Sequence, residues 1–525
     1  MKNISATKKI IAVVLIMVVL FATTVAVYMS NKADTASTVG TDTGTSTGTT
    51  VEYESIFKKD SVIDIKIEIA DSDWKSILAD PEAEEYKSAN VTVDGVTVEN
   101  VGFRTKGNLT LKSVANSTSE RYSFRIKMDK YVEGQTLSGL DELVVNNMYS
   151  DPSYMREYLS YEALREIGAD VPDAVFANIY VNGELYGFYL CVEAVDDSFL
   201  QSNFGSNDGN LYKQEQGSTL QYNEGSDYDS SELKVGDDES KTDLKNLIKV
   251  LNDMPEGQKG DIESVLDVDS ALKYIAANTV LGNYDSYNGN MAQNYYLYGQ
   301  DGKFTVIPWD YNMSIGGFGT GGDATAIPID EPVMGVDIDN LPLISKLLAV
   351  DEYKEKYHEY VKELLDYLDN FESRVTEVAD IIRPYVEADP SKFYTMDQFE
   401  ASIKYSETTE AATASADTGK DASKADTATG ASQNVNPGGQ QQPQNPQAAQ
   451  GGAGNSDGQA PPQGGFGDNK GGPGGGMGIG MGNSTSILNF IRDRVENITK
   501  QLAGELPTTG NTTMNNTKGV SRPTK

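Results

Sequence analysis

The sequence has very few of the residues that most often carry catalytic or metal chemistry. Among its 525 residues there are one cysteine and one histidine. A single cysteine excludes a disulfide within the chain and a zinc site built from cysteines. One histidine disfavours a Ser-His-Asp mechanism and any metal site made of several histidines. The remaining candidates for chemistry are Asp, Glu, Asn, Lys, Arg and Tyr.

The two rare residues themselves lie in patterns that predict structural positions. Cys191 lies in the apolar run "LYGFYLCVEAV", which predicts a thiol in the core. His358 lies in "DEYKEKYHEYVKELLDYL", where the apolar residues recur at helical spacing. Lys354 and Lys362 lie one turn to either side of it, so we expect His358 on the solvated face of a helix.

Positive charge is also scarce. The chain has 43 Lys and Arg against 78 Asp and Glu, and its formal net charge is −35. This argues against nucleic acid or an anionic surface as the main partner, because phosphate groups need a basic surface. A nucleotide site in such a chain would depend on metal ions and a few local cations.

The N-terminal end carries an uncharged apolar run, "IIAVVLIMVVLFATTVAVY", at residues 10–28. It is long enough to span a bilayer, and lysines precede it. We expect residues 1–30 to be a short cytoplasmic stub and a transmembrane signal-anchor, with residues 31–50 as a flexible linker. This places the main domain outside the cytoplasm at the cell membrane. A cleaved signal peptide, which would give a secreted protein, is the alternative.

Residues 51–404 have the composition of a globular domain, with strands first and mainly helices later. Runs such as "SVIDIKIEIA" and "FANIYVNGELYGFYLCVE" alternate as strands do, and the second contains an Asn-Gly hairpin turn. "SYMREYLSYEALREIG" fits a helix that ends at its glycine. Further helices fit residues 241–253, 269–281, 340–368 and 371–386. The fold class predicted is α+β.

The composition changes abruptly after this domain. Residues 405–484 are rich in Ser, Thr, Ala, Gln, Pro and Gly, which predicts a disordered insertion. Residues 485–505 return to helical spacing. We expect this helix to dock on the globular part, since an isolated helix of such length is marginal in water. Residues 506–525 are expected to be a disordered tail.

The stretch "NYDSYNGNMAQNYYLYGQDGKFTVIPWDYN" concentrates polar side chains around two short predicted strands. Turn formation alone would explain Asp285. Asp310 ends an apolar strand, where a carboxylate needs a partner. Two acids and an amide at strand ends also suit phosphoryl transfer, in which one Asp orients the nucleophile and an Asn and an Asp hold Mg²⁺. The spacing from Asp285 to Asn290 matches a kinase catalytic loop, but Asn294 is a second candidate.

Several motifs occur in an order that resembles the CotH family, atypical protein kinases named for a spore coat protein. They are "RTKGNLTL", "RYSFRIKMDKYVEG", "LDELVVNN", "YMREYL", "IYVNGELYGFYLCVEAVDDSFL", "LYK", "NYDSYNGNMAQNYYLY" and "VIPWDYN". The resemblance covers residues 51–404 and resumes in the helix at 485–505. It implies a divergent, two-lobed protein-kinase-like fold, with a strand-rich N-terminal part and a helical C-terminal part.

The resemblance also implies roles for the residues of the central stretch. Asp285 matches the family's catalytic Asp, while Asn294 and Asp310 match its metal-holding residues. The co-substrate implied is ATP with Mg²⁺ or Mn²⁺. The acceptor implied is a Ser/Thr-rich surface or spore coat protein. Many members have Asp where this chain has Asn312, which weakens the case for a second metal ion.

The N-terminal half is expected to supply the nucleotide contacts. Lys106 lies at the end of a predicted strand in "RTKGN", where it could contact phosphate oxygens. Alternatively, it could simply be an exposed basic residue at a strand end. Arg125 or Lys127 could pair with Glu157 of the following helix, as a kinase strand lysine does. Both could instead form surface ion pairs. Glu193 and Lys213 match family positions near the cleft.

Two other functions compete with a kinase. A non-catalytic, membrane-anchored surface or coat module would explain why the domain faces a compartment with little ATP. A carboxylate-based glycoside hydrolase would use the many acids and aromatics. The intact set of Asp285, Asn294 and Asp310 favours the kinase.

Overall fold

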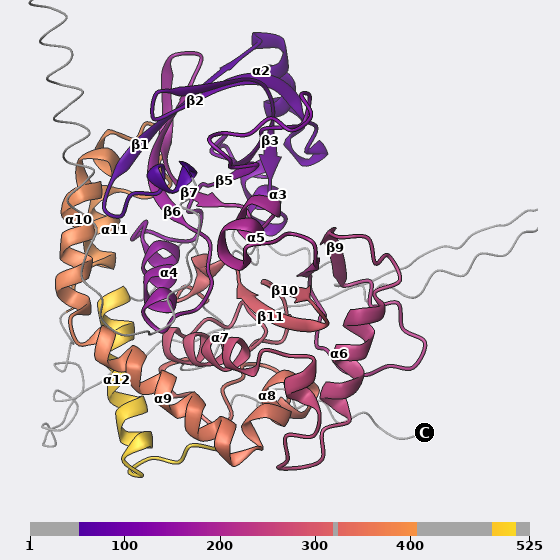
Figure 1. Ribbon diagram of the computed structural model, residues 1–525. Coiled ribbons are helices and arrows are strands. Elements are labelled where there is room, and N and C mark those ends of the chain that lie inside the picture. Colours follow the sequence, from indigo (N-terminus) through magenta and orange to yellow (C-terminus); the bar gives the residue numbers. More distant parts are fainter. Residues whose placement is uncertain (1–51, 319–323, 407–485, 511–525) are drawn as a thin grey trace, which may run out of the picture. The chain divides into compact units, whose positions relative to one another are not determined.

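Seven strands of the N-terminal part close into a barrel (Figure 1). The computed structural model describes residues 52–318, 324–406 and 486–510. The barrel order is β1-β2-β3-β4-β5-β7-β6, and β1 closes the ring by pairing in parallel with β6. The strands are β1 (Val62–Ile69), β2 (Lys87–Val93), β3 (Val96–Lys106), β4 (Ser123–Lys127), β5 (Glu142–Asn146), β6 (Ala174–Val181) and β7 (Glu184–Glu193).

Alternation along the strands decides which side chains fill the barrel. In β3 the buried Phe103 stacks on Phe124 of β4, with ring centroids 4.8 Å apart. Because side chains alternate along a strand, Arg104 and Lys106 lie on the other face of β3 and are only half-buried. Burial of the apolar set therefore fixes the side of the barrel on which Lys106 lies.

Short helices surround the barrel. They are η1 (Glu52–Ser55), α2 (Asp71–Ala79), η2 (Pro81–Ala83), α3 (Leu109–Ala115), α4 (Arg156–Glu166) and α5 (Asp197–Phe204). Helix α4 is buried along most of its length, because it packs on β6 on one side and on α7 and α9 on the other.

The second sheet and most of the helices form the rest of the domain (Figure 1). The sheet order is β11-β10-β8-β9. Its strands are β8 (Asn210–Gln214), β9 (Ser231–Val235), β10 (Tyr295–Gln300) and β11 (Lys303–Pro308). The helices are α6 (Thr242–Asn252), η3 (Ile262–Ser264), α7 (Val268–Leu281), η4 (Tyr311–Met313), η5 (Ala324–Ala326), η6 (Ile338–Asn340), α8 (Pro342–Leu348), α9 (Asp351–Leu368), α10 (Phe371–Ala388), α11 (Met396–Ser402) and α12 (Ile487–Leu502).

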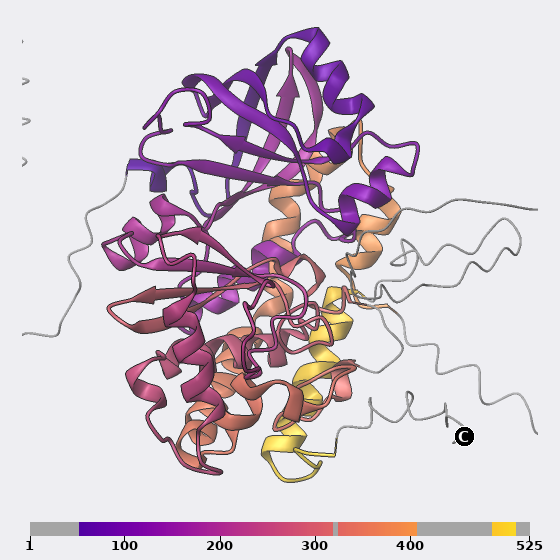
Figure 2. The same ribbon diagram turned by 90° about the vertical axis from the view of Figure 1, so that its right-hand side faces the viewer.

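Helices α10 and α11 lie alongside the barrel in both views (Figures 1 and 2). Tyr385 of α10 stacks on Phe188 of β7, with ring centroids 5.7 Å apart. Asp389, the residue after α10, pairs with the buried Arg121 at 2.6 Å. Contacts at this end of α10 therefore join the helical part to the barrel.

The helix expected at residues 340–368 is wrong in one respect, because the structure has two helices there. Helix α8 ends at Leu348 and α9 begins at Asp351. Val350 between them has an extended backbone, with φ −86° and ψ 116°. The buried Leu347 and Val350 belong to one core, so the apolar pattern continues across the break and conceals it.

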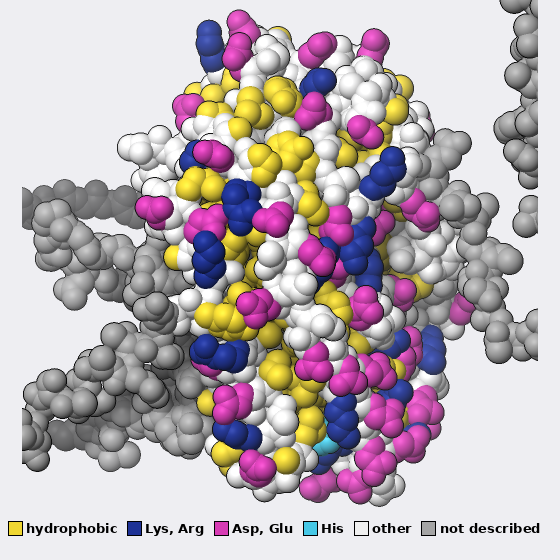
Figure 3. All heavy atoms as spheres, turned by 90° about the vertical axis from the view of Figure 1, so that its left-hand side faces the viewer, with side chains coloured by type: hydrophobic (Ala, Val, Ile, Leu, Met, Phe, Trp, Pro, Cys, Tyr) yellow, Lys and Arg dark blue, Asp and Glu magenta, His cyan; other side chains and the backbone are white. Residues whose placement is uncertain are grey.

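The two rare residues lie where the sequence predicts. Cys191 is a free, buried thiol. His358 is partly exposed on α9, and its Nε2 atom contacts Oδ1 of Asp330 at 2.7 Å. Figure 3 shows the face on which the histidine (cyan) lies, where basic and acidic side chains are interspersed and the acidic ones gather toward the lower end.

The structure has the mixed α+β composition that the sequence predicts, with strands first and mainly helices later. Among the described residues, no helix is both long and apolar enough to span a membrane. The predicted span at 10–28, the linker at 31–50 and nearly all of the predicted insertion lie outside those residues. Residues 506–510, assigned to a disordered tail, instead form hydrogen bonds with the segment before α8: the carbonyl of Thr508 accepts from the N–H of Asp330 at 2.8 Å, and the N–H of Gly510 donates to Oε2 of Glu331 at 2.9 Å.

Candidate functional site

A line of hydrogen bonds connects the end of β3 to helix α4. Lys106 ends β3, and its Nζ atom donates to Oδ1 of Asn146 at 3.1 Å. Asn146 ends β5, and its Nδ2 atom donates to Oε2 of Glu157 at 2.9 Å. The cation of Lys106 and the carboxylate of Glu157 are therefore joined through a single amide.

Helix α4 extends this line of hydrogen bonds to Asp310, two residues after β11. Tyr161 lies one turn after Glu157, and its hydroxyl donates to Oε1 of that carboxylate at 3.2 Å. The backbone N–H of Asp310 donates to the Tyr161 hydroxyl at 3.2 Å. Asp310 itself has a left-handed backbone, with φ 58°, which is uncommon outside glycine and often found at functional sites. The line thus runs from the barrel to the end of the second sheet.

The loop after α7 is held by a buried network of amides. Asn278 of α7 accepts at Oδ1 from the hydroxyl of Tyr311 at 2.7 Å, and its Nδ2 atom donates to Oδ1 of Asn288 at 3.1 Å. Asn288 in turn donates to the carbonyl of Pro332 at 2.8 Å. Asn288 therefore holds the turn at residues 283–290 through one hydrogen bond to α7 and one to Pro332.

Asp285 lies in this loop, next to the start of β10. Gln293 donates through Nε2 to Oδ1 of Asp285 at 2.8 Å, and Asn294 donates through Nδ2 to the backbone carbonyl of Asp285 at 2.7 Å. Asn294 directly precedes β10 and Asp310 follows β11 by two residues. Because these strands are antiparallel neighbours, both residues lie at the same end of the hairpin.

Two carboxyl groups of this site have raised pKa values. Burial, and secondly the charge of Asp310, raise the pKa of Glu157 to about 7. The same two causes raise the pKa of Asp285 to about 7. Burial lowers the pKa of Lys106, although Asp310 and Glu157 oppose that shift. The charge of Asp310 thus acts on two buried carboxyl groups and on one lysine.

The family model described as CotH kinase protein matches residues 103–410. This chain belongs to the CotH family. The match includes Lys106, Glu157, Asp285, Asn294 and Asp310. Strands β1 and β2 and helix α12 lie outside it.

A curated relative points to the same family. Inner spore coat protein H of Bacillus subtilis (strain 168) is 28% identical over 283 residues. The alignment covers 51% of this CotH-family chain and 75% of the relative. The name of that protein places it in the inner spore coat.

Arg125 and Lys127 do not form the expected pair with Glu157. Arg125 pairs with Glu142 at 2.9 Å, and Lys127 pairs with Asp129 at 3.0 Å. The reason is strand register: Lys106 lies opposite Ser123 of β4, at the strand ends where Asn146 also lies, whereas Arg125 lies two residues further along β4. Alternation alone places all three cations on one face and does not select among them.

The last two candidates lie in different surroundings. Lys213 of β8 pairs with Glu215 at 2.5 Å, and its charge is among those that lower the pKa of Lys106. Glu193 is 2% exposed and accepts from the hydroxyl of Tyr53 at 2.6 Å and from the N–H of Asp173 at 3.0 Å. Lys213 therefore belongs to the site electrostatically, whereas Glu193 is bonded to the N-terminal segment.

Asn294 and Asp310 offer the oxygen ligands that Mg²⁺ prefers in proteins. No described residue donates a hydrogen bond to the carboxylate of Asp310. The described residues contain no group of three or more His, Cys, Asp or Glu able to hold a metal ion. The Oδ1 atom of Asn312 is buried and has no hydrogen-bond partner among the described residues, which leaves this oxygen with its acceptor capacity unused.

Sequence reasoning missed the residues that connect the others. Asn146, Tyr161, Gln293 and Asn278 hold the candidate residues in place through the bonds given above. Tyr161 could have been found from its spacing of four residues after Glu157 on a predicted helix. Asn146 in "LVVNN" carries no comparable pattern, because its role depends on which strands are neighbours.

Proposed function

We propose that this CotH-family protein is a protein kinase that transfers the γ-phosphate of ATP to Ser or Thr. The observation that carries the proposal is the line Lys106–Asn146–Glu157–Tyr161, which ends at the backbone of Asp310. A lysine and a helix glutamate beside a metal-holding Asp are the parts that phosphoryl transfer needs. In this protein the amide of Asn146 bridges Lys106 and Glu157, whereas in protein kinases the lysine and the glutamate form a direct ion pair.

Lys106 would contact phosphate oxygens, and Asn294 and Asp310 would hold Mg²⁺ or Mn²⁺. When bound, the metal neutralises charge on the phosphate groups. Arg125 and Lys213 are further cations near Lys106, since the charges of both lower its pKa. They would bind the nucleotide from the barrel and from the second sheet. Roles for Lys127 and Glu193 in nucleotide binding lack support from their contacts.

Asp285 would act on the acceptor hydroxyl. In the transfer the hydroxyl oxygen bonds to the γ-phosphorus, the bond from that phosphorus to the leaving ADP oxygen breaks, and the hydroxyl proton passes to Asp285. A carboxyl with a pKa of about 7 suits this role, because it is partly ionised near neutral pH and accepts a proton readily. Gln293 fixes its orientation.

The acceptor would be a Ser/Thr-rich protein of the spore coat or the cell surface. Support comes from the relative's description as an inner spore coat protein. The predicted membrane span would place the domain at the cell membrane, outside the cytoplasm, or release it if the span is cleaved.

A non-catalytic coat or surface module is the second candidate. The crowding of Glu157, Asp285 and Asp310 favours it, because a site with three acids repels ATP unless a metal ion is bound. The two functions differ in whether Mg²⁺–ATP binds at all.

Calorimetry with Mg²⁺–ATP separates the two candidates. We expect the full chain to bind, and Asp310→Asn to weaken binding at least about tenfold by loss of one metal ligand. Asp301→Asn is the matched control, since Asp301 has φ 52° and lies at the opposite end of the same hairpin. Equal affinities for the two variants would refute the metal role, and no binding by the full chain would favour the module.

A further inference from the structure

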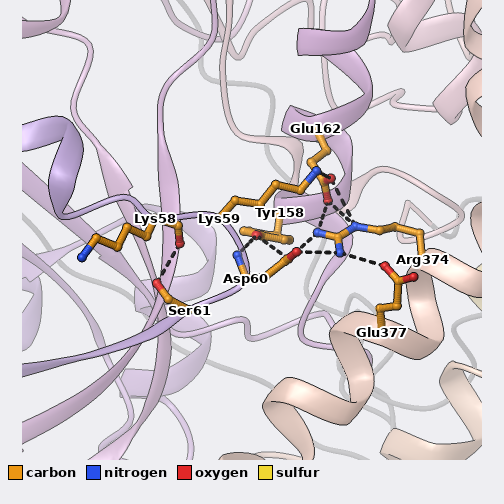
Figure 4. Close-up of polar contacts among 8 residues, drawn as sticks. All are labelled: Lys58, Lys59, Asp60, Ser61, Tyr158, Glu162, Arg374 and Glu377. Atoms are coloured by element: carbon orange, nitrogen blue, oxygen red, sulfur yellow. Dashed lines mark hydrogen bonds and ion pairs between the residues drawn. The ribbon is translucent and has the colours of Figure 1, made fainter. Parts of the chain in front are cut away.

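Helix α10 is fastened to the barrel part near both of its ends. Asp389 and Tyr385 make the contacts at its C-terminal end that are described above. Near its N-terminal end Arg374 contacts helix α4 and the segment 58–61, which leads into β1 (Figure 4). A single helix thus connects the helical part to the element that carries Glu157.

Arg374 and the polar side chains around it form a partly buried cluster, which we call the Arg374 cluster: Lys59, Asp60, Tyr158, Glu162 and Arg374 (Figure 4). The Nε and Nη2 atoms of Arg374 each lie 2.9 Å from Oε2 of Glu162. Its Nη1 atom lies 3.0 Å from Oδ2 of Asp60. Lys59 adds a contact to Oε1 of Glu162 at 2.6 Å. The side chains of Arg374 and Glu162 are only 12% and 9% exposed, so the contact between them is largely shielded from water, whereas Asp60 and Lys59 are 34% and 61% exposed.

Tyr158 connects the same cluster to the N-terminal segment. Its hydroxyl donates to Oδ1 of Asp60 at 3.2 Å and accepts from the N–H of Asp60 at 3.0 Å. Helix α4 is therefore held at two successive turns, at Tyr158 and at Glu162. A planar guanidinium that engages two carboxylates restricts rotation as well as distance.

The two faces of α4 make different sets of contacts. Glu157 and Tyr161 belong to the candidate site, and Tyr158 and Glu162 belong to the Arg374 cluster. Each pair is four residues apart, so its members lie one above the other on the helix. The faces are about 100° apart, since an α-helix has 3.6 residues per turn. A rotation of α4 cannot shift one pair without shifting the other.

We propose that Arg374 is a positioning residue for the site: it fixes the rotation of α4 and so holds Glu157 against Asn146 and Lys106. The inference rests on the proposed kinase function for its effect on activity, but its effect on α4 does not depend on that function. Because Asp60 and Lys59 belong to the cluster, the segment that precedes β1 takes part in holding α4.

Hydrogen exchange of the full chain tests the positioning directly. In Arg374→Gln we expect amides of α4 to exchange about tenfold or more faster, because the helix loses its fixed partner. Glu377→Gln is the matched control, since Glu377 lies on α10, contacts Arg374 at 3.3 Å and is 62% exposed. It is expected to leave α4 unchanged. Arg374→Lys keeps the positive charge but lacks the planar guanidinium that engages two carboxylates. We therefore expect the exchange rate of α4 in this variant to lie between those of the unaltered protein and Arg374→Gln.

A kinetic measurement separates positioning from plain stabilisation. In Arg374→Gln the KM for Mg²⁺–ATP should rise about tenfold at a temperature where the variant is fully folded, and Arg374→Lys should recover part of it. If Arg374→Gln does not fold, Tyr158→Phe, which loses one hydroxyl, should show the same changes on a smaller scale.

The outcomes distinguish failure of the inference from failure of the proposed function. Unchanged exchange in α4, with faster exchange only in residues 58–61, would overturn the inference. An unchanged KM in a variant with faster α4 exchange would overturn it as well, because α4 would then move without affecting the site. If the unaltered protein transfers no phosphate, the kinase proposal fails, and α4 exchange alone decides the positioning role.

Discussion

Glu193 is a buried carboxyl group whose ionisation opposes folding. Burial, and secondly the charge of Asp173, raise its pKa to about 7, above its ordinary value of 4.5. The folded protein therefore holds this proton more tightly than the unfolded chain does. The destabilisation is absent below about pH 4.5, grows as the pH rises, and is complete above about pH 7.

Replacing Glu193 by Gln removes this titration. We expect the stability of Glu193→Gln relative to the unaltered protein to increase by about 2 kcal/mol from about pH 5 to about pH 8, since one pKa unit is worth about 1.4 kcal/mol. Denaturant titrations at both pH values measure the difference. Glu232→Gln on β9, an exposed position, is the control for loss of one carboxylate. A relative stability of Glu193→Gln that is the same at both pH values would contradict a raised pKa.

The sequence predicts individual site residues better than their partners. Asp285, Asn294 and Asp310 are found because they lie at turns and strand ends within one short stretch. The partner of Glu157 is not found, since it depends on the register of β3, β4 and β5, which brings Lys106 and Asn146 to one end of the barrel. Glu193 has a family match, but its contact with Tyr53 joins positions far apart in the sequence.

At the scale of elements, helix α12 contacts both α7 and the residues at η5. Asp285, Asn294 and Asp310 lie between these two elements in the sequence. Arg494 is fully buried and donates to the carbonyl of Thr279 in α7 at 2.9 Å, and to the carbonyls of Thr325 and Ile327 at 3.0 and 2.6 Å. Helix α7 leads into the Asp285 loop, so the contact of α12 with the end of α7 also helps to hold that loop in place.

Arg494→Met should remove the hydrogen bonds to the carbonyls of Thr279 and Thr325 and one of the two to the carbonyl of Ile327, which also accepts from Nε2 of Gln501 at 3.3 Å. We expect the free energy of unfolding to fall by about 2 kcal/mol or more, since a buried polar group that loses its partner costs about 1–3 kcal/mol. Arg492→Met on the same helix is the control, because Arg492 is 42% exposed and its ion pair with Asp493 is worth under about 1 kcal/mol. Denaturant unfolding that gives similar losses for both variants would contradict a supporting role for Arg494.

Helices whose apolar residues recur at a regular spacing are predicted well from the sequence. A break between two helices is not predicted where no glycine or proline marks it. Helices α7 and α10 lie within two residues of their expected bounds. The break between α8 and α9 has no glycine or proline at its extended residue, Val350, so nothing local indicates it. Short elements such as α2 and β9 are too brief for their periodicity to stand out.

At the scale of the whole molecule, the two sides of the low-complexity region lie together. Asn489 of α12 donates through Nδ2 to Oγ of Ser406. Replacing residues 407–485 by a ten-residue Gly/Ser linker should therefore preserve folding. We expect the free energy of unfolding to stay the same or rise by roughly 1–2 kcal/mol, because each halving of loop length returns about 0.6 kcal/mol of closure entropy.

Denaturant unfolding of this variant also tests the predicted insertion. A variant that ends before residue 407, and so lacks α12, is the control and should be strongly destabilised, since Ile487 and Ile498 would leave the core. If the linker variant lost stability to a similar degree, residues 407–485 would contribute to the folded core, contrary to their composition.

The central claim is that the end of the β10–β11 hairpin, the Asp285 loop and the Lys106–Glu157 line form a phosphoryl-transfer site. The most direct measurement follows labelled phosphate from ATP, with Mg²⁺ or Mn²⁺, to a Ser/Thr-rich acceptor. We predict transfer by the full chain, and for Asp285→Asn a loss of at least about a hundredfold with ATP binding retained, because only the proton acceptor is removed. Equal transfer by Asp285→Asn, or no transfer by the full chain with either metal, would contradict the account.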